Sequence, residues 1–273
     1  MNEEIRNIIK RALKEDIPDK DLSSFYLFNE EISFGNFIAK ETGVISGIDV
    51  CKETFLMVDS NIEFKLFKQN GESVKKGDIL ASVRGKTKSI LMAERVGLNF
   101  LQRMSGIATM TNKFVREVKP YKTKILDTRK TTPTLRILEK QAVRDGGGTN
   151  HRMNLSDMVM LKDNHLKAAS SLKDAVNIVK SHIDESIKIE VEVENIAMFL
   201  EAKESKADII MLDNMSNEMM EECVKLNNGK KLLEASGNMT LKRVKSVAKT
   251  GVDFISVGGL THSYKSLDIS LKF

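Results

Sequence analysis

After Pro120, short apolar segments alternate with longer amphipathic ones in a regular series. The apolar segments are KILDT, MVMLKD, IKIEVEVE, ADIIMLDN, KLLEASG and DFISVGG. Strands that alternate with helices of about 10–15 residues are typical of βαβ units and a parallel sheet. No GxGxxG follows the first segment, which argues against a dinucleotide-binding fold. Residues 120–260 are too few for eight βα units, so the sequence predicts an open, incomplete α/β barrel of the TIM type.

The chain before Pro120 has a mixed pattern of helix and strand signals. Apolar residues at helical spacing predict an amphipathic surface helix at the N-terminus, with Ile5, Ile8, Ile9 and Leu13 on one face. The strand-like segments GNFIAKE, GVISG, NIEFKLF and DILASVRG follow, and Asn70-Gly71 before the last of them indicates a hairpin turn. From Lys88 to about Lys119 the pattern is helical, with a break expected near Ser105-Gly106.

The composition excludes several classes of protein. The net charge of +5, from 43 basic and 38 acidic residues, does not reach the basic stripe of a nucleic-acid-binding protein, and aromatic residues, at 5%, are too sparse for base stacking. No apolar run reaches the ~20 residues of a membrane span. Cys51 and Cys223 lie far apart and indicate reduced, structural thiols rather than a disulfide or a zinc site. We therefore expect a cytoplasmic protein that binds neither nucleic acid nor membrane.

Each predicted barrel strand ends in charged residues or glycine, at the edge where α/β barrels hold their active sites. The basic residues there suit a multiply charged anion, and they are Arg129, Lys130, His151, Arg152 and Lys162, the last followed by Asp163 and Asn164. His151 by itself is more typical of a satisfied loop or core histidine. The carboxylates of Glu192 and Asp213 suit ribose hydroxyls or a magnesium ion carried in by phosphates.

Glycine-rich segments follow the last two predicted strands. Ser236-Gly237-Asn238 and Gly258-Gly259 suit a phosphate cradle made of backbone N–H groups, and Thr240 suits the cap of the next helix. Together, the anion, sugar and phosphate sites indicate a phosphoribosyl donor that meets an acidic acceptor.

An earlier segment, GGGTNHRMN at residues 146–154, places three glycines shortly before His151 and Arg152. Glycine has the highest entropic cost of ordering, so three together imply a special backbone requirement. We expect these glycines to let the backbone turn closely enough to bring both side chains beside Arg129.

A long central block, LDTRKTTPTLRILEKQAVRDGGGTNHRMNLSDMVMLKDNH, resembles the signature of the quinolinate phosphoribosyltransferases. The upstream segment AERVGLNFLQRMSGIAT and the downstream segments IEVEVEN, MLDN, EASGN and SVGGLTHS match that family in order. The N-terminal segment ALKEDIPDKDLSS is similar to the family's opening but lacks its glycines, which affects a surface turn.

The resemblance implies an α/β protein of two domains and a symmetric assembly. Residues 1–105 would form an α/β sandwich, to which residues 262–273 return, and residues 106–261 would form the open barrel with the active site. It also implies a homodimer in which Arg103, of the segment QRMSG, is lent to the active site of the partner subunit.

The implied reaction takes quinolinate and phosphoribosyl pyrophosphate to nicotinate mononucleotide, CO2 and pyrophosphate, a step of de novo NAD synthesis. It uses Mg²⁺ that phosphoribosyl pyrophosphate carries, with no metal ligand assigned to the protein. The resemblance assigns the quinolinate contacts to Arg103, Arg129, His151, Arg152 and Lys162. It assigns catalysis to Lys130, Glu192 and Asp213, and further substrate contacts to Thr128, Ser236, Gly237, Asn238, Gly258 and Gly259. Glu190, Glu192 and Glu194 share strand parity, and only the family motif singles out Glu192.

Other functions stay open at this point. They are a molybdenum-associated paralogue, a salvage enzyme acting on nicotinic acid, and a non-catalytic phosphate or nucleotide sensor. Lys162 favours the biosynthetic enzyme over the paralogue, and the number of cations favours a dianion over nicotinate. Lys130, Glu192 and Asp213 together argue against a sensor, because loss of these residues would mark one.

Overall fold

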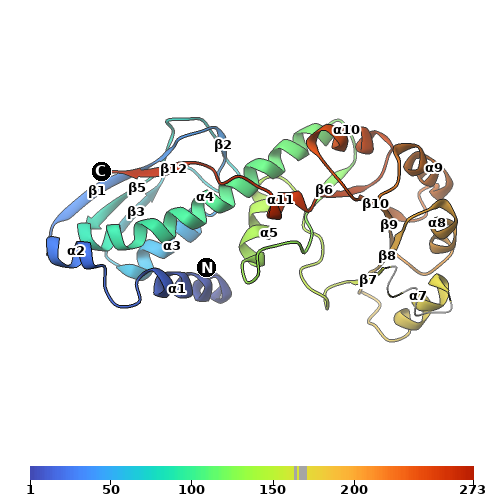
Figure 1. The fold of residues 1–273 in the computed structure, drawn as a ribbon, viewed down its shortest axis with the longest axis horizontal. Coiled ribbons are helices and arrows are strands. Elements are labelled where there is room, and N and C mark those ends of the chain that lie inside the picture. Colours follow the sequence, from blue (N-terminus) through green and yellow to red (C-terminus); the bar gives the residue numbers. More distant parts are fainter. Residues whose placement is uncertain (163–164, 166–170) are drawn as a thin grey trace. The chain divides into compact units, whose positions relative to one another are not determined.

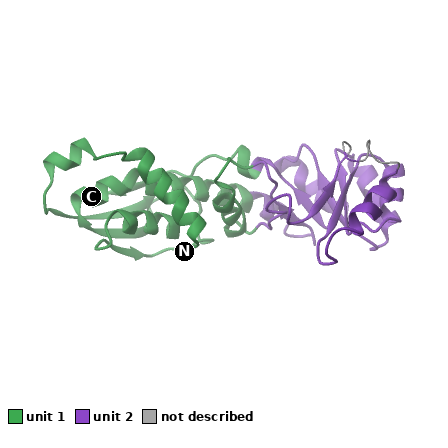
Figure 2. Cartoon of the chain, turned by 90° about the horizontal axis from the view of Figure 1, so that it is seen from below, with its two compact units in different colours: residues 1–112, 131–147, 260–273 green, residues 113–130, 148–259 purple. Residues whose placement is uncertain are grey.

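The computed structural model of the protein describes residues 1–162, 165 and 171–273, drawn in Figure 1. The chain forms two compact units (Figure 2). Unit 1 consists of residues 1–112, 131–147 and 260–273, and unit 2 of residues 113–130 and 148–259. Both units are built from segments that are distant in the sequence.

Unit 1 holds an antiparallel sheet in the order β12-β1-β5-β3. Its strands are β1 (Ile32–Ala39), β3 (Glu63–Leu66), β5 (Ile79–Lys86) and β12 (Ile269–Lys272), and the short strands β2 (Gly43–Val44) and β4 (Ser73–Val74) pair separately. The C-terminal strand therefore lies against β1, near the start of the chain.

Two helices cover the sheet of unit 1. Side chains from α3 (Ile48–Val58) and α4 (Thr87–Val118) share one hydrophobic cluster with the strands, in which Phe37, Phe55 and Leu80 are fully buried. The N-terminal helix α1 (Glu3–Asp16) buries Ile5, Ile8 and Ile9, as its spacing predicts, and α2 (Leu22–Leu27) follows. The expected α/β sandwich is confirmed.

The helix break expected near Ser105-Gly106 is wrong, because α4 runs unbroken for 32 residues through both positions. The two small residues instead allow close packing. A Cβ atom on Gly106 would lie 2.3 Å from the carbonyl oxygen of Lys265, so only glycine admits the C-terminal segment there. The hydroxyl of Ser105 accepts a hydrogen bond from the amide of Ser46, at 3.0 Å. No helix in the described part of the chain combines the length and apolar character needed to cross a membrane.

Unit 2 is a parallel sheet of six strands in the order β6-β11-β10-β9-β8-β7. The strands are β6 (Lys124–Leu126), β7 (Val159–Leu161), β8 (Ile189–Val193), β9 (Ile209–Asp213), β10 (Leu232–Ser236) and β11 (Phe254–Ser256). The helices α7 (Leu172–Lys180), α8 (Ile196–Lys203), α9 (Asn217–Asn227) and α10 (Leu241–Lys249) alternate with them.

The barrel is open between its first two strands. The first strand, β6, pairs with the last strand, β11, whereas β7 forms the opposite edge of the sheet. The predicted incomplete α/β barrel is therefore confirmed, and its opening lies between β6 and β7.

The glycine run at residues 146–148 connects α5 (Arg136–Asp145) to the open edge of the barrel. Gly146 packs so tightly that a Cβ atom would lie 2.4 Å from the carbonyl oxygen of Ala108, and Gly147 has a φ of 88°. This left-handed residue ends the helix, because its amide bonds back to the carbonyl of Arg144 at 2.8 Å. Thr149 then forms a parallel bridge with Leu126 of β6. The glycines thus carry the chain from a helix end to a strand edge within a few residues.

Candidate active site

The carboxyl ends of the parallel strands bring the predicted polar residues of unit 2 to one edge of the sheet. Arg129 follows β6 and is exposed, and Arg152 follows the glycine run and is half-buried. Burial lowers the pKa of Arg152, and the nearby positive charge of Arg129 lowers it further. Two arginines that repel each other in this way form a site where a bound anion relieves the repulsion.

The guanidinium of Arg152 is held in place by its own loop. It donates to the carbonyl oxygen of Met158 at 2.9 Å and approaches the Sδ atom of Met160 at 3.7 Å. The loop itself is fixed to the end of β6, because the buried carboxylate of Asp127 accepts the amide of His151 at 2.8 Å and also the side chain of Asn150.

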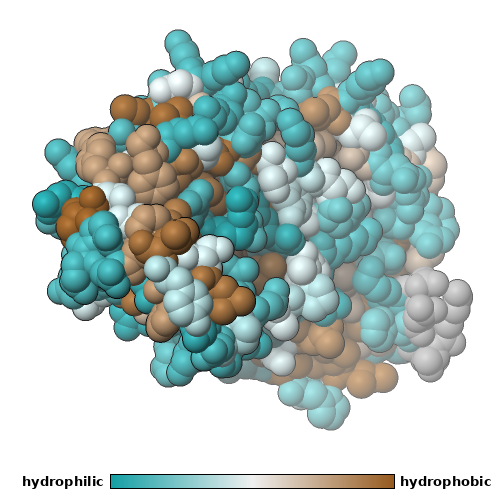
Figure 3. Space-filling model, turned by 60° about the vertical axis from the view of Figure 1, so that its left-hand side comes forward, coloured by the Kyte–Doolittle hydropathy of each residue, from teal (hydrophilic) through white to brown (hydrophobic). Residues whose placement is uncertain are grey.

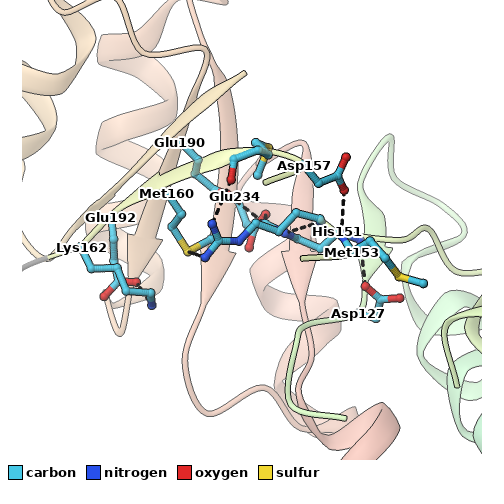
Figure 4. A network of polar contacts seen from close by, with 11 residues as sticks. Asp127, His151, Met153, Asp157, Met160, Lys162, Glu190, Glu192 and Glu234 are labelled. Atoms are coloured by element: carbon cyan, nitrogen blue, oxygen red, sulfur yellow. Dashed lines mark hydrogen bonds and ion pairs between the residues drawn. The ribbon is translucent and has the colours of Figure 1, made fainter. Parts of the chain in front are cut away.

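His151 lies below this edge, between two buried glutamates that sequence reasoning did not single out (Figure 4). Its Nε2 atom is 2.9 Å from Oε2 of Glu190 on β8 and 3.4 Å from Oε2 of Glu234 on β10. On the other side of the ring, Nδ1 accepts the amide of Arg152 at 2.7 Å. We call His151, Glu190 and Glu234 the acidic cluster.

The acidic cluster retains protons at neutral pH. Burial alone lowers the pKa of His151, but hydrogen bonds and the charges of Glu234 and Glu190 outweigh it and raise the pKa to about 10. Burial, and then the charge of Glu234, raise the pKa of Glu190 to about 7. Two buried carboxylates beside one imidazole are costly unless they are paired, so the cluster holds one proton more than a neutral imidazole and two carboxylates would.

Glu190 and Glu192 share one face of β8, and Glu194 follows directly after the strand; the three glutamates differ in depth. Glu190 is fully buried, Glu192 is partly buried and Glu194 is exposed, so they run from the barrel interior to its edge. Glu192 Oε2 lies 2.6 Å from Nζ of Lys162, at the end of the neighbouring strand β7. Glu192, the glutamate that the family motif selects, therefore lies near the carboxyl end of β8, with the cation of Lys162 beside it.

Two loops at the ends of β9 and β10 interlock. The side chain of Asn214 donates to Asp213 at 2.7 Å and accepts from Asn238 at 3.2 Å. Gly237 has a φ of 94°, and a Cβ atom there would lie 2.2 Å from Oδ1 of Asn214. Arg243 of α10 donates to the carbonyls of Gly237 and Met215, at 2.8 and 2.9 Å, and so braces both loops from behind.

The remaining predicted residues of unit 2 also lie near the strand ends. The hydroxyl of Thr128 accepts the amide of Lys130 at 3.1 Å, so a tight turn follows β6. Gly258 lies two residues after the end of β11, and Gly259 begins the short helix α11 (Gly259–His262). Thr240 caps α10 as predicted, because its hydroxyl accepts the amide of Arg243 at 3.3 Å. Asp163 and Asn164, expected after Lys162, lie outside the described residues.

Arg103 belongs to α4 of unit 1 and is anchored there. Its guanidinium pairs with the fully buried carboxylate of Glu139 on α5 and with the hydroxyl of Thr132, and it stacks 5.1 Å from the ring centroid of Tyr264. The other oxygen of Glu139 accepts the amide of Thr132 at 3.1 Å. Only about a quarter of the Arg103 side chain (25%) stays exposed, which leaves it fixed in direction with a free approach on one side.

Sequence reasoning missed the residues that support the site from behind. Asp127, Glu190, Glu234 and Arg243 contact loop backbone or other side chains of the site rather than lying at its surface. The sequence signal of the three acidic residues was weak, since an acidic residue in or beside an apolar strand predicts an exposed position as readily as a buried one. Chemically, the edge combines fixed cations, carboxylates at its rim and glycine-rich loops, which suits an anionic acceptor and a phosphorylated sugar.

Comparisons with known proteins agree with this chemistry. The C-terminal domain model of quinolinate phosphoribosyl transferase matches residues 107–272, and the N-terminal domain model matches residues 21–105. The chain is 41% identical to a probable nicotinate-nucleotide pyrophosphorylase [carboxylating] of Bacillus subtilis, over 98% of this chain and 93% of that protein. It is 43% identical to a quinolinate phosphoribosyltransferase [decarboxylating] of Nicotiana tabacum, over 98% of this chain and 82% of that protein.

The solved structures include one of similar fold and sequence. The crystal structure of NadC from Streptococcus pyogenes has a TM-score of 0.96 and 41% identity, and the match covers 98% of this chain and 95% of that one. The likeness therefore extends over both units of the chain.

Proposed function

Because the chain belongs to the quinolinate phosphoribosyltransferase family, we propose that the polar edge of its parallel sheet carries out the reaction of that family. The protein is a pentosyltransferase that joins quinolinate to the phosphoribosyl group of phosphoribosyl pyrophosphate, with decarboxylation. The products are nicotinate mononucleotide, CO2 and pyrophosphate, so the enzyme serves NAD synthesis. The observation that carries the assignment to this edge is the convergence of Arg129, Arg152 and Lys162 at the carboxyl ends of the strands, with the carboxylate of Glu192 2.6 Å from Lys162.

The cations of the edge would hold quinolinate. Arg129 and Arg152 offer planar donor groups that suit carboxylates, and Lys162 adds a point charge beside Glu192. Binding through several fixed cations would turn the ring nitrogen toward C1 of the ribose. His151, which the resemblance also assigns to quinolinate, has both ring nitrogens engaged within the protein.

The carboxylates and loops would hold the phosphoribosyl donor. When pyrophosphate departs, positive charge develops at C1, and Glu192 and Asp213 at the rim would stabilise it while they hold the ribose hydroxyls. Ser236, Gly237, Asn238, Gly258 and Gly259 offer backbone amides for the phosphate groups, and Thr128 and Lys130 lie at the neighbouring strand end. After N-ribosylation the pyridinium accepts the electron pair of the breaking carbon–carbon bond, so the 2-carboxylate leaves as CO2.

Magnesium fits this site as an ion that the substrate brings. Among the described residues, Glu192 is paired with Lys162 and Asp213 with Asn214, so neither is a vacant ligand for a resident metal. Bound to the diphosphate, Mg²⁺ would neutralise charge on the leaving pyrophosphate. Lys130 would assist at the same group from the protein side.

The decisive test of the function is a decarboxylation assay. Purified protein is given carboxyl-labelled quinolinate and Mg²⁺, with phosphoribosyl pyrophosphate present or omitted, and nicotinate replaces quinolinate in a parallel reaction. We expect labelled CO2 and nicotinate mononucleotide only when both quinolinate and the donor are present. Turnover of nicotinate instead would favour a salvage enzyme, and no turnover by folded protein would favour the paralogue or a sensor.

We also propose a homodimer in which Arg103 completes the active site of the partner subunit. Support comes from the fixed direction of Arg103 and from exposed hydrophobic side chains of unit 1, among them Phe34 (56% exposed) and Leu27 (70% exposed). Figure 3 shows apolar residues gathered on the face that contains this part of unit 1. Two free, buried cysteines and the charged substrates favour action in the cytoplasm.

Subunit complementation tests the proposed exchange of Arg103. Arg103→Ala and Lys130→Ala are each expected to abolish activity. If Arg103 acts across the interface, a hybrid of the two variants has one complete site, and random mixing restores about a quarter of the wild-type activity. If Arg103 acts in its own subunit, no hybrid site is complete and the mixture stays inactive.

A further inference from the structure

The acidic cluster is the one buried group of titratable residues in the described part of the chain whose composition also suits a metal ion. Its three ligand-type atoms lie within 4.8 Å of one another. Oε1 of Glu190 and Oε1 of Glu234 have no hydrogen-bond partner among the described residues, and Oε2 of Glu234 has only the 3.4 Å ion-pair contact with Nε2 of His151. Buried carboxylate oxygens of this kind normally find a donor, so the cluster has a task that packing alone does not explain.

The contacts of the two ring nitrogens of His151 show whether the cluster is a metal site or a hydrogen-bonded group. Nδ1 accepts the amide of Arg152 at 2.7 Å, so this nitrogen carries no proton. The ring proton is therefore on Nε2, which points at Glu190 and Glu234. A metal ion would need the lone pair of that same nitrogen, so the geometry favours proton donation from Nε2 over metal ligation.

The acidic cluster links the interior of the barrel to the loop that carries Arg152. Glu190 and Glu234 come from β8 and β10, which flank β9, and they hold Nε2 from below. The opposite nitrogen of the ring holds the backbone of Arg152. Asp127 holds the amide of His151, so each end of the peptide between His151 and Arg152 is fixed by a separate acceptor.

We propose that Glu190 and Glu234 are positioning residues, which orient the His151 ring so that it fixes the Arg152 backbone and presents the Arg152 guanidinium to quinolinate. This inference rests on the proposed function, because it assigns quinolinate as the anion at Arg152. The charged groups that act on Glu190 are Glu234 from β10 and His151 and Arg152 from the loop.

The shared proton supports this arrangement. Because Nδ1 accepts the Arg152 amide, the ring takes up no second proton there, and the raised pKa of Glu190 indicates that the retained proton lies on the carboxylate side of the ring, on an oxygen of Glu190. Such a carboxyl group supplies an O–H donor to oxygens that otherwise lack one. It also removes one of the two buried negative charges below a site that receives a dianion.

Steady-state kinetics of paired variants test the positioning role. Glu190→Ala removes the acceptor for Nε2, whereas Glu190→Gln keeps an oxygen in the same place. We expect Glu190→Ala to raise KM for quinolinate about tenfold or more, with kcat and KM for phosphoribosyl pyrophosphate changed less than about threefold. Glu190→Gln should recover most of the affinity. Glu194→Ala, directly after the end of the same strand and exposed, is the control and should match the wild type.

A second measurement keeps the inference testable if Glu190→Ala fails to fold. Nitrogen-15 NMR of labelled wild-type enzyme, with four histidines in the chain, reports which nitrogen of His151 is protonated. We expect an unprotonated Nδ1 and a protonated Nε2, both unchanged when quinolinate binds. A protonated Nδ1, a large shift of Nε2 on binding, or one equivalent of tightly bound metal lost in Glu190→Gln would each overturn the inference. If wild-type protein fails to bind quinolinate, the proposed function fails, while the ring protonation still tests the cluster.

Discussion

Replacement of Gly237 by alanine tests whether the interlocked loops after β9 and β10 form the phosphate cradle. Gly237 has a φ of 94°, and an alanine Cβ would lie 2.2 Å from Oδ1 and 3.0 Å from the backbone nitrogen of Asn214. Asn214 must therefore move its side chain. That movement breaks its bonds to Asp213 and Asn238, which are 2.7 and 3.2 Å long.

The cost of this change follows from its parts. A left-handed backbone costs a non-glycine residue roughly 1–2 kcal/mol. Each of the two lost hydrogen bonds contributes about 1 kcal/mol. The variant loop therefore relaxes away from its native arrangement, and about 3 kcal/mol is needed to restore it around a bound diphosphate. This free energy corresponds to a loss of about 100-fold in kcat/KM for phosphoribosyl pyrophosphate.

Steady-state kinetics with phosphoribosyl pyrophosphate as the varied substrate measures this loss. Equilibrium binding of quinolinate, measured by calorimetry without the donor, should stay within about twofold of wild type, because Arg129, Arg152 and Lys162 come from other strand ends. Gly229→Ala is the control. Gly229 also has a positive φ, 73°, but no described atom lies within 4 Å of its added Cβ. It should lose about 1 kcal/mol of unfolding free energy and keep full kcat/KM.

A comparison of the two variants can refute the assignment of this loop to the phosphate groups of the donor. If Gly237→Ala loses stability but keeps kcat/KM for phosphoribosyl pyrophosphate, as Gly229→Ala is expected to do, the loop does not hold the donor. If Gly237→Ala weakens quinolinate and the donor equally, the loop supports the whole edge rather than the phosphates.

Three further predictions concern the glycine run, the acidic cluster and the long helix. Gly147→Val places a β-branched residue at a φ of 88°. We expect its affinity for quinolinate to fall about tenfold or more, while the yield of soluble protein changes little. Equal losses of affinity and yield would show that the glycine has only a structural role. The acidic cluster has pKa values raised to about 10 and about 7, and these belong to the interacting group as a whole, so its contribution to stability is largest at low pH. It is lost as the pH rises through these values, first through the lower and then through the higher one. Urea unfolding between pH 4.5 and 10 should show this decline, and Glu190→Gln should reduce the part of it between pH 4.5 and about 7. A flat wild-type profile would contradict the raised values. Gly106→Ala forces a Cβ atom to 2.3 Å from the carbonyl oxygen of Lys265, so we expect the free energy of unfolding to fall by about 2–3 kcal/mol. An unchanged urea midpoint would show that the C-terminal segment shifts without cost.

The order of the barrel elements could be predicted from the sequence, because the information is local. Each strand and helix after Pro120 shows its own periodicity, and each of the six predicted strands is present in the sheet. The rule that parallel strands end at one edge then placed Arg129, Lys162, Glu192 and Asp213 together before any coordinates. Thr240 as a helix cap was predicted for the same reason, since a cap depends only on its neighbours in the chain.

The break expected in α4 failed because the same local signal has two physical causes. Ser105-Gly106 interrupts the apolar pattern whether the helix ends there or another segment packs closely against it. Only the position of Lys265, which is distant in the sequence, distinguishes the two.

The acidic cluster shows what only the tertiary structure decided. The sequence by itself determined that Glu190 and Glu192 share a strand face, and that His151 follows a glycine run; Glu194, expected on the same face, lies after the strand end. It could not determine that β8 and β10 flank β9, or that the glycine run returns to the open edge beside β6. These long-range pairings bring His151 between Glu190 and Glu234, and they bury the two carboxylates with a single imidazole. Periodicity specifies the face of each strand, whereas the burial and protonation of a side chain depend on its neighbours across the sheet.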